Sequence, residues 1–214
     1  MRGSVTTAEE WDALPLRRVP TQARSRDKVL RALVAADRLL RTEGPDAINL
    51  PRVAAEADVS VGALYQYLPD RDAITRALVA RYHSRLELLL DDAIAQTTRS
   101  AAPADPVAHV IDAVAGVYLD QQPVRALHAV STTPAGFDER TLHRQRMAAK
   151  VATLMRVSGL ASDGRDELRA RVAFLSADAV LHEAFAASGS ERAALLAELQ
   201  DMLRRFLTPS DPAR

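Results

Sequence analysis

The segment from Asn49 to Arg71, NLPRVAAEADVSVGALYQYLPDR, contains two short helical patterns separated by a tight turn. Asn49 suits the N-cap of the first pattern, because its side chain accepts from the free amides of a first helical turn. Apolar residues then recur at i, i+3, i+4 and i+7, which predicts a two-turn helix with one apolar stripe: Leu50, Val53, Ala54 and Ala57. The turn at 58–60 follows, and Ser60 caps a second helix from Val61 to about Leu68.

The second helix has a small, polar and aromatic outer face. If Leu64 and Leu68 point inward, a rotation of about 100° per residue sends Gly62 and Gln66 to the opposite side. Ala63 and Tyr65 then flank that face, and Tyr67 lies at its margin. Such a face suits a DNA major groove, since small residues allow close approach and a Gln amide pairs with adenine N6 and N7. Tyrosine hydroxyls and first-turn amides reach phosphates. An ordinary helical corner with surface tyrosines explains the spacing equally well.

Helical patterns run through most of the 214 residues. Glycine is scarce, at 8 residues, and no stretch shows the sustained alternation of a half-buried strand. Helix breaks are expected at 44–45, 58–60, 69, 101–106, 123, 134–136, 158–164 and 188–190. The sequence therefore predicts an all-α protein of about nine helices. The first runs from about Gln22 to Glu43, with one apolar face: Val29, Leu33, Ala36 and Leu40.

The formal net charge is zero, but positive charge gathers near the N-terminus. Between Ala13 and Arg31, six basic residues accompany a single acidic one, Asp27. We expect any contact with a polyanion to begin there. A solvated, partly disordered leader explains the same composition, and we expect a basic, partly disordered N-terminal segment over residues 1–23.

An ordered set of motifs resembles the DNA-binding domain of the TetR family of transcriptional regulators over residues 24–86. The family pattern has a first helix ending in Gly, an Ile/Val-Ala pair, a Gly-Val-Ser turn, a Thr/Ala-Leu-Tyr-x-His/Tyr-Phe recognition helix and a following Lys. This chain has the corresponding residues in the same order: Gly44, Val53-Ala54, Val59-Ser60, Ala63-Leu64-Tyr65, Tyr67-Leu68 and Arg71. The resemblance implies a helix-turn-helix at 49–68.

The resemblance also implies individual DNA contacts. Tyr65, Tyr67 and Arg71 would bind phosphates, while four residues would face bases: Val61, Gly62, Ala63 and Gln66. The helix-turn-helix would enter the groove at Asn49, Leu50, Pro51 and Arg52. Ser60 and the arginines of the basic segment, Arg24 and Arg26, complete the predicted DNA-binding set.

The sequence departs from the family pattern at three places. Asp58 stands where the turn usually has Gly, Leu68 replaces Phe, and Asn49-Leu50 replaces the Thr or Ser near the start of the first motif helix. Asp58 brings a negative charge near the DNA, and a non-Gly residue is strained if the turn needs a positive φ, although Asp tolerates that conformation better than most residues.

The remaining chain predicts a second, helical domain at 87–207, followed by a disordered tail at 208–214. Asp70 caps a long helix from Arg71 to about Thr98, which we expect to pack the DNA-binding domain at its start and the second domain at its end. The last two helices, about Arg165 to Ala187 and Glu191 to Phe206, fit the place where relatives form a dimer interface. Two-fold dimers bind half-sites about 34 Å apart, so we expect a homodimer rather than a simply internal helix pair.

The family architecture implies an effector pocket among the middle helices. Its candidate residues are the larger or polarisable ones: Tyr118, His128, Phe137, Met147, Phe174, His182 and Phe185. For each histidine, a hydrogen-bonded structural role is the main alternative. No pair has the spacing of a metal site such as His-Glu-x-x-His, so neither a metal nor another cofactor is predicted.

Enzyme signatures are missing from the sequence. It has no Gly-x-Gly-x-x-Gly, no phosphate-binding Gly-rich loop ending in Lys, no Gly-x-Ser-x-Gly elbow and no cysteine. Asp91 and Asp92 are adjacent on a helix and point in different directions. We therefore expect no enzyme, although a helical enzyme or interaction protein is the outside alternative.

The sequence as a whole predicts a cytoplasmic transcriptional regulator, because no apolar run is long enough to span a membrane. We expect a homodimeric repressor that binds a double-stranded DNA operator and is released by a small-molecule effector. An activator, or a regulator gated by a partner protein, is the alternative.

Overall fold

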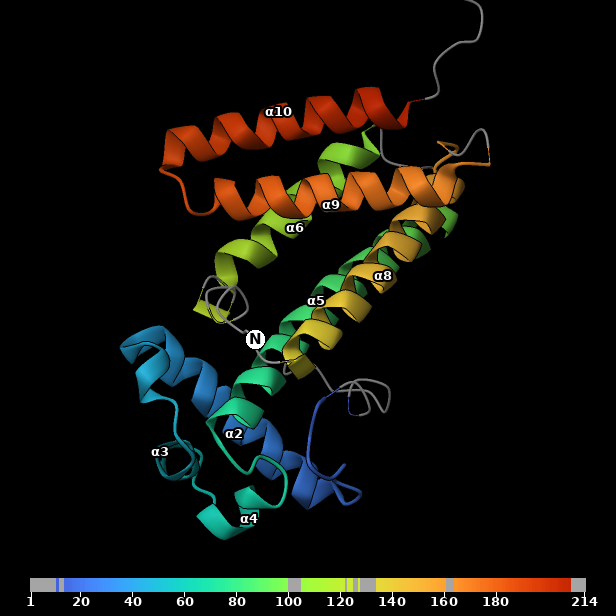
Figure 1. The fold of residues 1–214 in the computed structure, drawn as a ribbon. Helices are drawn as coiled ribbons and strands as arrows, with labels where there is room; N and C mark the ends of the chain where they lie inside the picture. The colour runs from blue at the N-terminus through green and yellow to red at the C-terminus, as the bar shows by residue number, and fades with distance from the viewer. Residues whose placement is uncertain are drawn as a thin grey trace, which may run out of the picture. The chain divides into compact units, whose positions relative to one another are not determined.

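The computed structural model describes residues 11, 14–99, 105–121, 123–124, 127, 134–160 and 164–208. Within these residues the chain forms eight α-helices and one short 3₁₀ helix, and no strand (Figure 1). The all-α prediction is confirmed. The N-terminal elements are α2 (Ala23–Glu43), η1 (Pro45–Ala47), α3 (Leu50–Glu56), α4 (Val61–Tyr65) and α5 (Arg71–Arg99). The later helices are α6 (Pro106–Asp120), α8 (Pro134–Val157), α9 (Asp166–Ala184) and α10 (Gly189–Leu207).

The chain separates into two compact units. One comprises residues 1–84 and 123–136, and the other comprises residues 85–122 and 137–214. Helix α5 is unbroken and contributes its first half to the N-terminal unit and its second half to the C-terminal unit.

The N-terminal unit is built around α2, whose predicted apolar face is completely buried: Val29, Leu33, Ala36 and Leu40. Gly44 ends this helix at φ 86°, a conformation that favours glycine, and its N–H donates to the Leu40 carbonyl. The first half of α5 adds the buried side chains of Ile74, Leu78 and Tyr82. Buried side chains of α2 and α5 therefore contribute to the core of this unit.

Two predicted helix boundaries were wrong. Helix α4 ends at Tyr65 rather than Leu68, because the chain tightens into a turn in which the Tyr67 and Leu68 amides both donate to the Leu64 carbonyl at 2.9 Å. Residues 134–136 begin α8 instead of breaking a helix. Proline is well tolerated at a first helical position, since its missing N–H would have no partner there.

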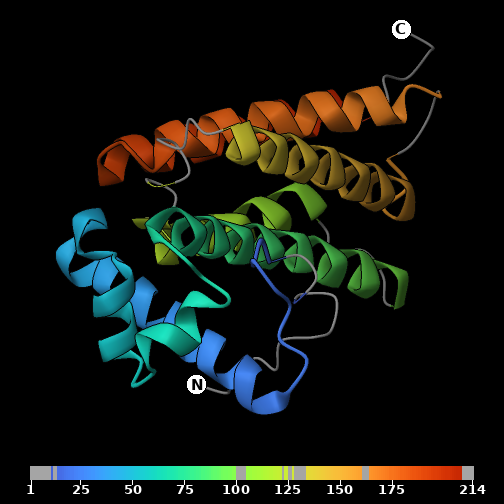
Figure 2. The same ribbon diagram turned by 60° about the horizontal axis from the view of Figure 1, so that its bottom comes forward.

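The C-terminal unit packs the second half of α5 with α6, α8, α9 and α10. Helices α9 and α10 form an antiparallel pair that lies side by side in both views (Figures 1 and 2). Helix α8 runs along α5, and Lys150 pairs with Asp91 between them. Arg204 of α10 donates to Asp105 at 2.7 Å, and Asp105 also caps α6 by accepting from the Ala108 amide at 2.9 Å. These charged contacts fix the helices around a shared apolar interior.

Candidate nucleic-acid interface and ligand cavity

Two side-chain caps define the helix-turn-helix. The Asn49 carboxamide oxygen accepts from the Arg52 amide at 3.0 Å, and the Ser60 hydroxyl accepts from the Ala63 amide at 3.3 Å. Helices α3 and α4 then pack together, with Val53 and Ala54 of α3, Leu64 of α4 and Leu68 of the following turn all buried. Both caps agree with the sequence prediction. They fix the start of each short helix and thereby its orientation.

The turn between α3 and α4 holds Asp58 at φ 51°, and Asp58 is the only non-glycine residue with positive φ among those described. This turn therefore does need a positive φ, the condition under which a non-glycine residue is strained. Arg31 of α2 supports the turn from below, because its Nη1 donates to the carbonyl oxygens of Ala57 at 2.9 Å and Asp58 at 3.3 Å.

The outer face of α4 is exposed as the sequence predicts. Val61, Gly62, Tyr65 and Gln66 are exposed, and Ala63 and Tyr67 are half-buried. A Cβ added at Gly62 would meet no atom within 4 Å, so the packing of the protein itself does not require a glycine there. Glycine costs about 1 kcal/mol relative to alanine inside a helix.

Several predicted DNA-contacting arginines already have partners within the N-terminal unit. Arg52 pairs with Glu43. Arg71 donates to the Pro45 carbonyl at 2.9 Å and to Asp46 at 3.2 Å, although its side chain is half-exposed. Arg26 donates to the Pro20 carbonyl at 3.0 Å.

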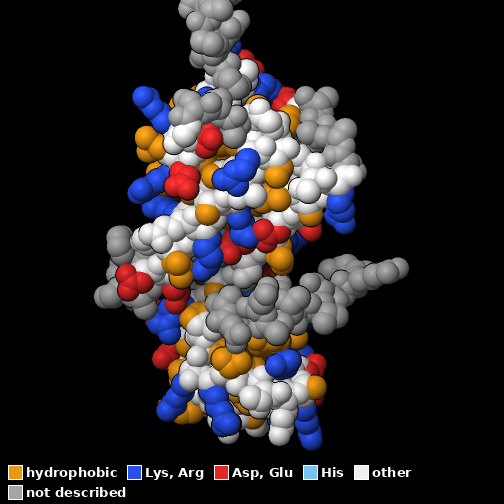
Figure 3. Space-filling view, turned by 90° about the vertical axis from the view of Figure 1, so that its right-hand side faces the viewer, with side chains coloured by type: hydrophobic (Ala, Val, Ile, Leu, Met, Phe, Trp, Pro, Cys, Tyr) orange, Lys and Arg blue, Asp and Glu red, His pale blue; other side chains and the backbone are white. Residues whose placement is uncertain are grey.

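The remaining predicted DNA contacts divide by exposure. Arg24 and Pro51 are exposed, and Leu50 is half-buried at the start of α3. Figure 3 shows Lys and Arg side chains that project from the surface of the N-terminal unit.

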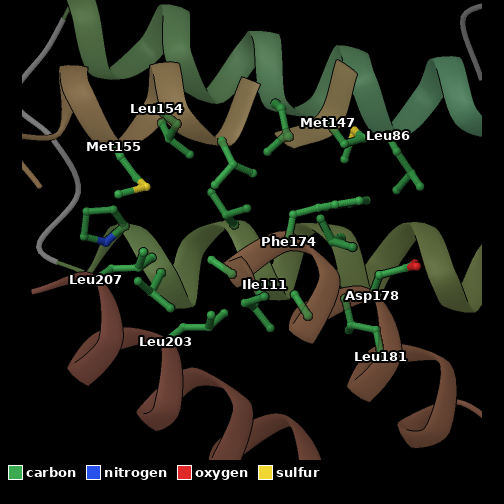
Figure 4. A pocket seen from close by; sticks show the side chains of 18 of the residues that line it. Leu86, Ile111, Met147, Leu154, Met155, Phe174, Asp178, Leu181, Leu203 and Leu207 are labelled. Atoms are coloured by element: carbon green, nitrogen blue, oxygen red, sulfur yellow. The ribbon is translucent and has the colours of Figure 1, made fainter. Parts of the chain in front are cut away.

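The C-terminal unit encloses an apolar cavity of about 100 Å³ between α5, α6, α8, α9 and α10. Leu86, Asp178 and Leu181 lie at one end, Met155 and Leu207 at the other, and Phe174 crosses the middle (Figure 4). Most of its wall is aliphatic. The polar side chains in the wall are Tyr118, His143, Ser158 and Asp178.

Three of the predicted pocket residues line this cavity: Tyr118, Met147 and Phe174. His182 and Phe185 do not line it, but both rings contact the Tyr118 ring, with centroids at 5.8 and 5.5 Å. His128 lies outside the described residues, as does the Phe137 side chain. Sequence reasoning missed the long aliphatic residues of five helices, because nothing in a core-like pattern distinguishes a cavity wall from filled core.

Two carboxylates of the C-terminal unit, Asp178 in the cavity wall and Glu87 on α5, are held by hydrogen bonds. Burial raises the pKa of Asp178. Hydrogen bonds from His182 and Tyr118 and the positive charge of Arg144 lower this pKa by more than burial raises it, so the net pKa lies below the ordinary value. The Tyr118 hydroxyl donates to Asp178 at 3.1 Å. Both groups therefore already have a hydrogen-bond partner within the protein.

Glu87 of α5 is bound in the same way. Burial raises its pKa, while hydrogen bonds from His143 at 2.8 Å and Arg146 at 3.0 Å outweigh burial and bring the net pKa below the ordinary value. The buried Ser158 hydroxyl differs from these groups, because it has no hydrogen-bond partner among the described residues. Ser158 is therefore the wall's available polar group.

The described residues contain no cluster of three or more His, Asp or Glu side chains that could hold a metal ion. Among the same residues, no helix is both long and apolar enough to cross a membrane.

Capped helices joined by a short turn, with an exposed face of small and polar residues, define a helix-turn-helix protein. Two family models match the chain: "Bacterial regulatory proteins, tetR family" over residues 32–78, and "Tetracyclin repressor-like, C-terminal domain" over residues 102–207. The chain belongs to the TetR family of DNA-binding transcriptional regulators.

Solved structures share the fold. A TetR-family regulator from Mesorhizobium loti is 18% identical with a TM-score of 0.71, covering 87% of this chain and 98% of its own. One from Pectobacterium atrosepticum is 16% identical with a TM-score of 0.69, covering 90% and 100%. SmeT, the repressor of the Stenotrophomonas maltophilia multidrug efflux pump SmeDEF, is 18% identical with a TM-score of 0.58, covering 83% and 87%. A SmeT–triclosan complex is also similar, at a TM-score of 0.60. No curated protein matches the sequence.

Proposed function

We propose that this protein is a homodimeric repressor that binds operator DNA through α4 and is released when an apolar small molecule occupies the cavity of the C-terminal unit. The observation that carries the DNA part is the exposed face of α4. Gly62 leaves the backbone open to close approach, and Gln66 one turn later is exposed beside it. A glutamine amide in the major groove pairs with adenine.

The dimer part rests on the outer surface of α9. Leu168, Val172 and Leu175 recur at i, i+4 and i+7, and Leu168 is 62% exposed. Large apolar side chains aligned on one helix face favour burial against another surface. On α10, Met202 and Phe206 are exposed one turn apart. A second copy of the chain would cover these residues, as the family architecture implies.

The release part rests on the cavity. Its size is comparable to an engineered cavity of about 150 Å³ that binds benzene, so a single apolar ring is the natural probe. SmeT, which shares the fold, is a repressor of an efflux pump and is seen with triclosan. A ligand releases DNA only if it binds the DNA-incompetent conformation more tightly than the competent one.

A substitution of Gly62 tests DNA binding most directly. Gly62→Leu should raise the free energy of unfolding by roughly 0.5–1 kcal/mol, because leucine is the better helix former. The same variant should lose binding to the DNA upstream of its gene in a mobility-shift assay. Gly116→Leu on α6 is the matched control, since a Cβ there also meets nothing within 4 Å. Full binding by Gly62→Leu would contradict an α4 interface.

Gln66→Ala tests base recognition. The variant should change the preference between operator sequences by about 1–3 kcal/mol at one position, while Gln145→Ala on exposed α8 should not. Uniform weakening across all sequences would assign Gln66 to the phosphates instead.

A further inference from the structure

The segment preceding α2 is bound to the turn that follows α4. Trp11 and Leu14 are buried, and the Arg17 amide donates to the Tyr67 carbonyl at 3.0 Å. At the other end of the segment, the Pro20 carbonyl accepts from Arg26 at 3.0 Å, and the Arg26 guanidinium lies 5.9 Å from the centre of the Trp11 ring. These contacts fix residues 14–20, which we call the arm, against α2 and the end of α4.

The arm brings a cation onto the candidate DNA-binding face. The Arg17 guanidinium lies over the Tyr65 ring at 5.5 Å from its centre, and half of the Tyr65 side chain is exposed. Arg17 and the adjacent Arg18 are both exposed. Neither arginine has a carboxylate partner among the described residues, unlike Arg52 and Arg71 of the same unit.

We infer that Arg17 and Arg18 bind phosphates of the DNA backbone beside the groove that α4 enters. This inference rests on the proposed function. Guanidinium groups pair with phosphate oxygens in a bidentate geometry, and stacking on Tyr65 orders Arg17 before DNA arrives. Less side-chain freedom is then lost on binding. The arm extends the interface beyond the helix-turn-helix and supplies charge that the neutral chain lacks overall.

The double variant Arg17→Ala/Arg18→Ala tests the inference without undocking the arm, because the bond to Tyr67 is made by the Arg17 backbone amide. The assay is the affinity for the DNA upstream of the gene, measured by fluorescence anisotropy at several salt concentrations. Affinity falls as salt rises, so a plot of log affinity against log salt has a negative slope. Each lost phosphate contact should make this slope shallower by about 0.9. The slope of the double variant should therefore be shallower by about 1.8 per protomer, and its affinity near 0.15 M salt should be lower by a factor of about ten or more.

Two further variants sharpen the result. Arg17→Lys/Arg18→Lys should recover most of the slope, because the charge is retained. Arg99→Ala/Arg156→Ala removes two exposed arginines from the C-terminal unit and should leave the slope unchanged. Trp11 fluorescence, from the chain's single tryptophan, verifies that each variant keeps the buried Trp11 that precedes the arm packed in place.

The alternative outcomes are distinct. An unchanged slope in the double alanine variant overturns the inference, even if the affinity falls, since Arg17 would then act only by positioning Tyr65. If the wild-type protein itself does not bind the DNA, the proposed function fails and the inference fails with it. Wild-type binding with an unaltered variant rejects the inference alone.

Discussion

Arg31 on α2 donates from Nη1 to the carbonyl oxygen of Ala57, 2.9 Å away at the C-terminal end of α3. The last carbonyls of a helix have no partner within it and carry partial negative charge, so a guanidinium is a favourable cap. The bond ties the first helix of the motif to the core helix of its unit.

Arg31→Ala should lower the free energy of unfolding of the N-terminal unit by about 1 kcal/mol. Arg41→Ala is a close control, because both arginines pair with an aspartate four residues earlier, at 3.0 and 2.8 Å, and only Arg31 reaches α3. Urea unfolding followed by Trp11 fluorescence measures the difference. Equal losses in the two variants would show that the bond to Ala57 contributes nothing.

Asp58→Gly should stabilise the protein by roughly 0.5 kcal/mol, because glycine adopts φ 51° without steric strain. It should also tighten DNA binding, since a negative charge near the phosphates is removed. Asp58→Asn separates the two effects: it removes the charge and keeps a residue that tolerates this conformation, so affinity should rise with little change in stability. A Gly variant less stable than wild type would contradict strain at this turn.

The pH dependence of stability should involve Glu87. A carboxyl whose pKa is lower in the folded than in the unfolded protein stabilises the fold above the unfolded pKa, and that contribution is lost as pH falls through the folded pKa. Glu87→Gln should cost about 1–2 kcal/mol at pH 7 and flatten the loss of stability below about pH 4.5. Thermal unfolding by circular dichroism between pH 3 and 7 measures this. Glu198→Gln, on the exposed surface of α10, should leave the profile unchanged.

Val172→Glu should convert the proposed dimer into monomers, since a charge would enter an apolar contact without a partner. Sedimentation velocity measures the change, and DNA affinity should fall with it, because one protomer engages only one half-site. Leu119→Glu is the control, because Leu119 is an exposed apolar side chain on α6. A dimer that persists in Val172→Glu would place the interface elsewhere.

Small aromatic probes should stabilise the protein by binding in the cavity. The Ser158 hydroxyl can hydrogen-bond phenol but not toluene, so it should raise the affinity for phenol relative to that for toluene. Ser158→Ala should reduce the phenol-to-toluene affinity ratio about five-fold, the equivalent of one hydrogen bond of about 1 kcal/mol. Ala177→Leu, which fills the cavity, should abolish stabilisation by both probes, whereas Ala149→Leu on the exposed face of α8 should not. Thermal-shift titrations measure these effects. Equal stabilisation of Ala177→Leu would place the binding site elsewhere.

Local features of the fold could be predicted from the sequence because they depend on neighbouring residues. The caps at Asn49, Ser60 and Asp70 each involve an amide three residues away, with Asp70 accepting from Ala73 at 2.7 Å. The buried stripe of α2 follows from helical periodicity in the same way.

The cavity could not be predicted, because its geometry joins residues far apart in the chain. Asp178 and Tyr118 are 60 positions apart and meet only when α6 and α9 pack. The docking of Arg17 on Tyr65 also escaped prediction, since a run of basic residues looks the same whether it is folded or solvated.

The cavity wall selects ligands mainly by exclusion. The Asp178 carboxylate, the Tyr118 hydroxyl and the His143 imidazole of the wall already bond to one another or to other side chains. A sugar, nucleotide or amino acid entering the cavity would lose its hydration and face a wall that is mostly apolar, at a cost of several kcal/mol. A hydrophobic compound has few polar groups to desolvate, so it avoids this cost. If the cavity binds the proposed effector, the cost of removing water therefore excludes polar compounds and favours hydrophobic ones of many different structures.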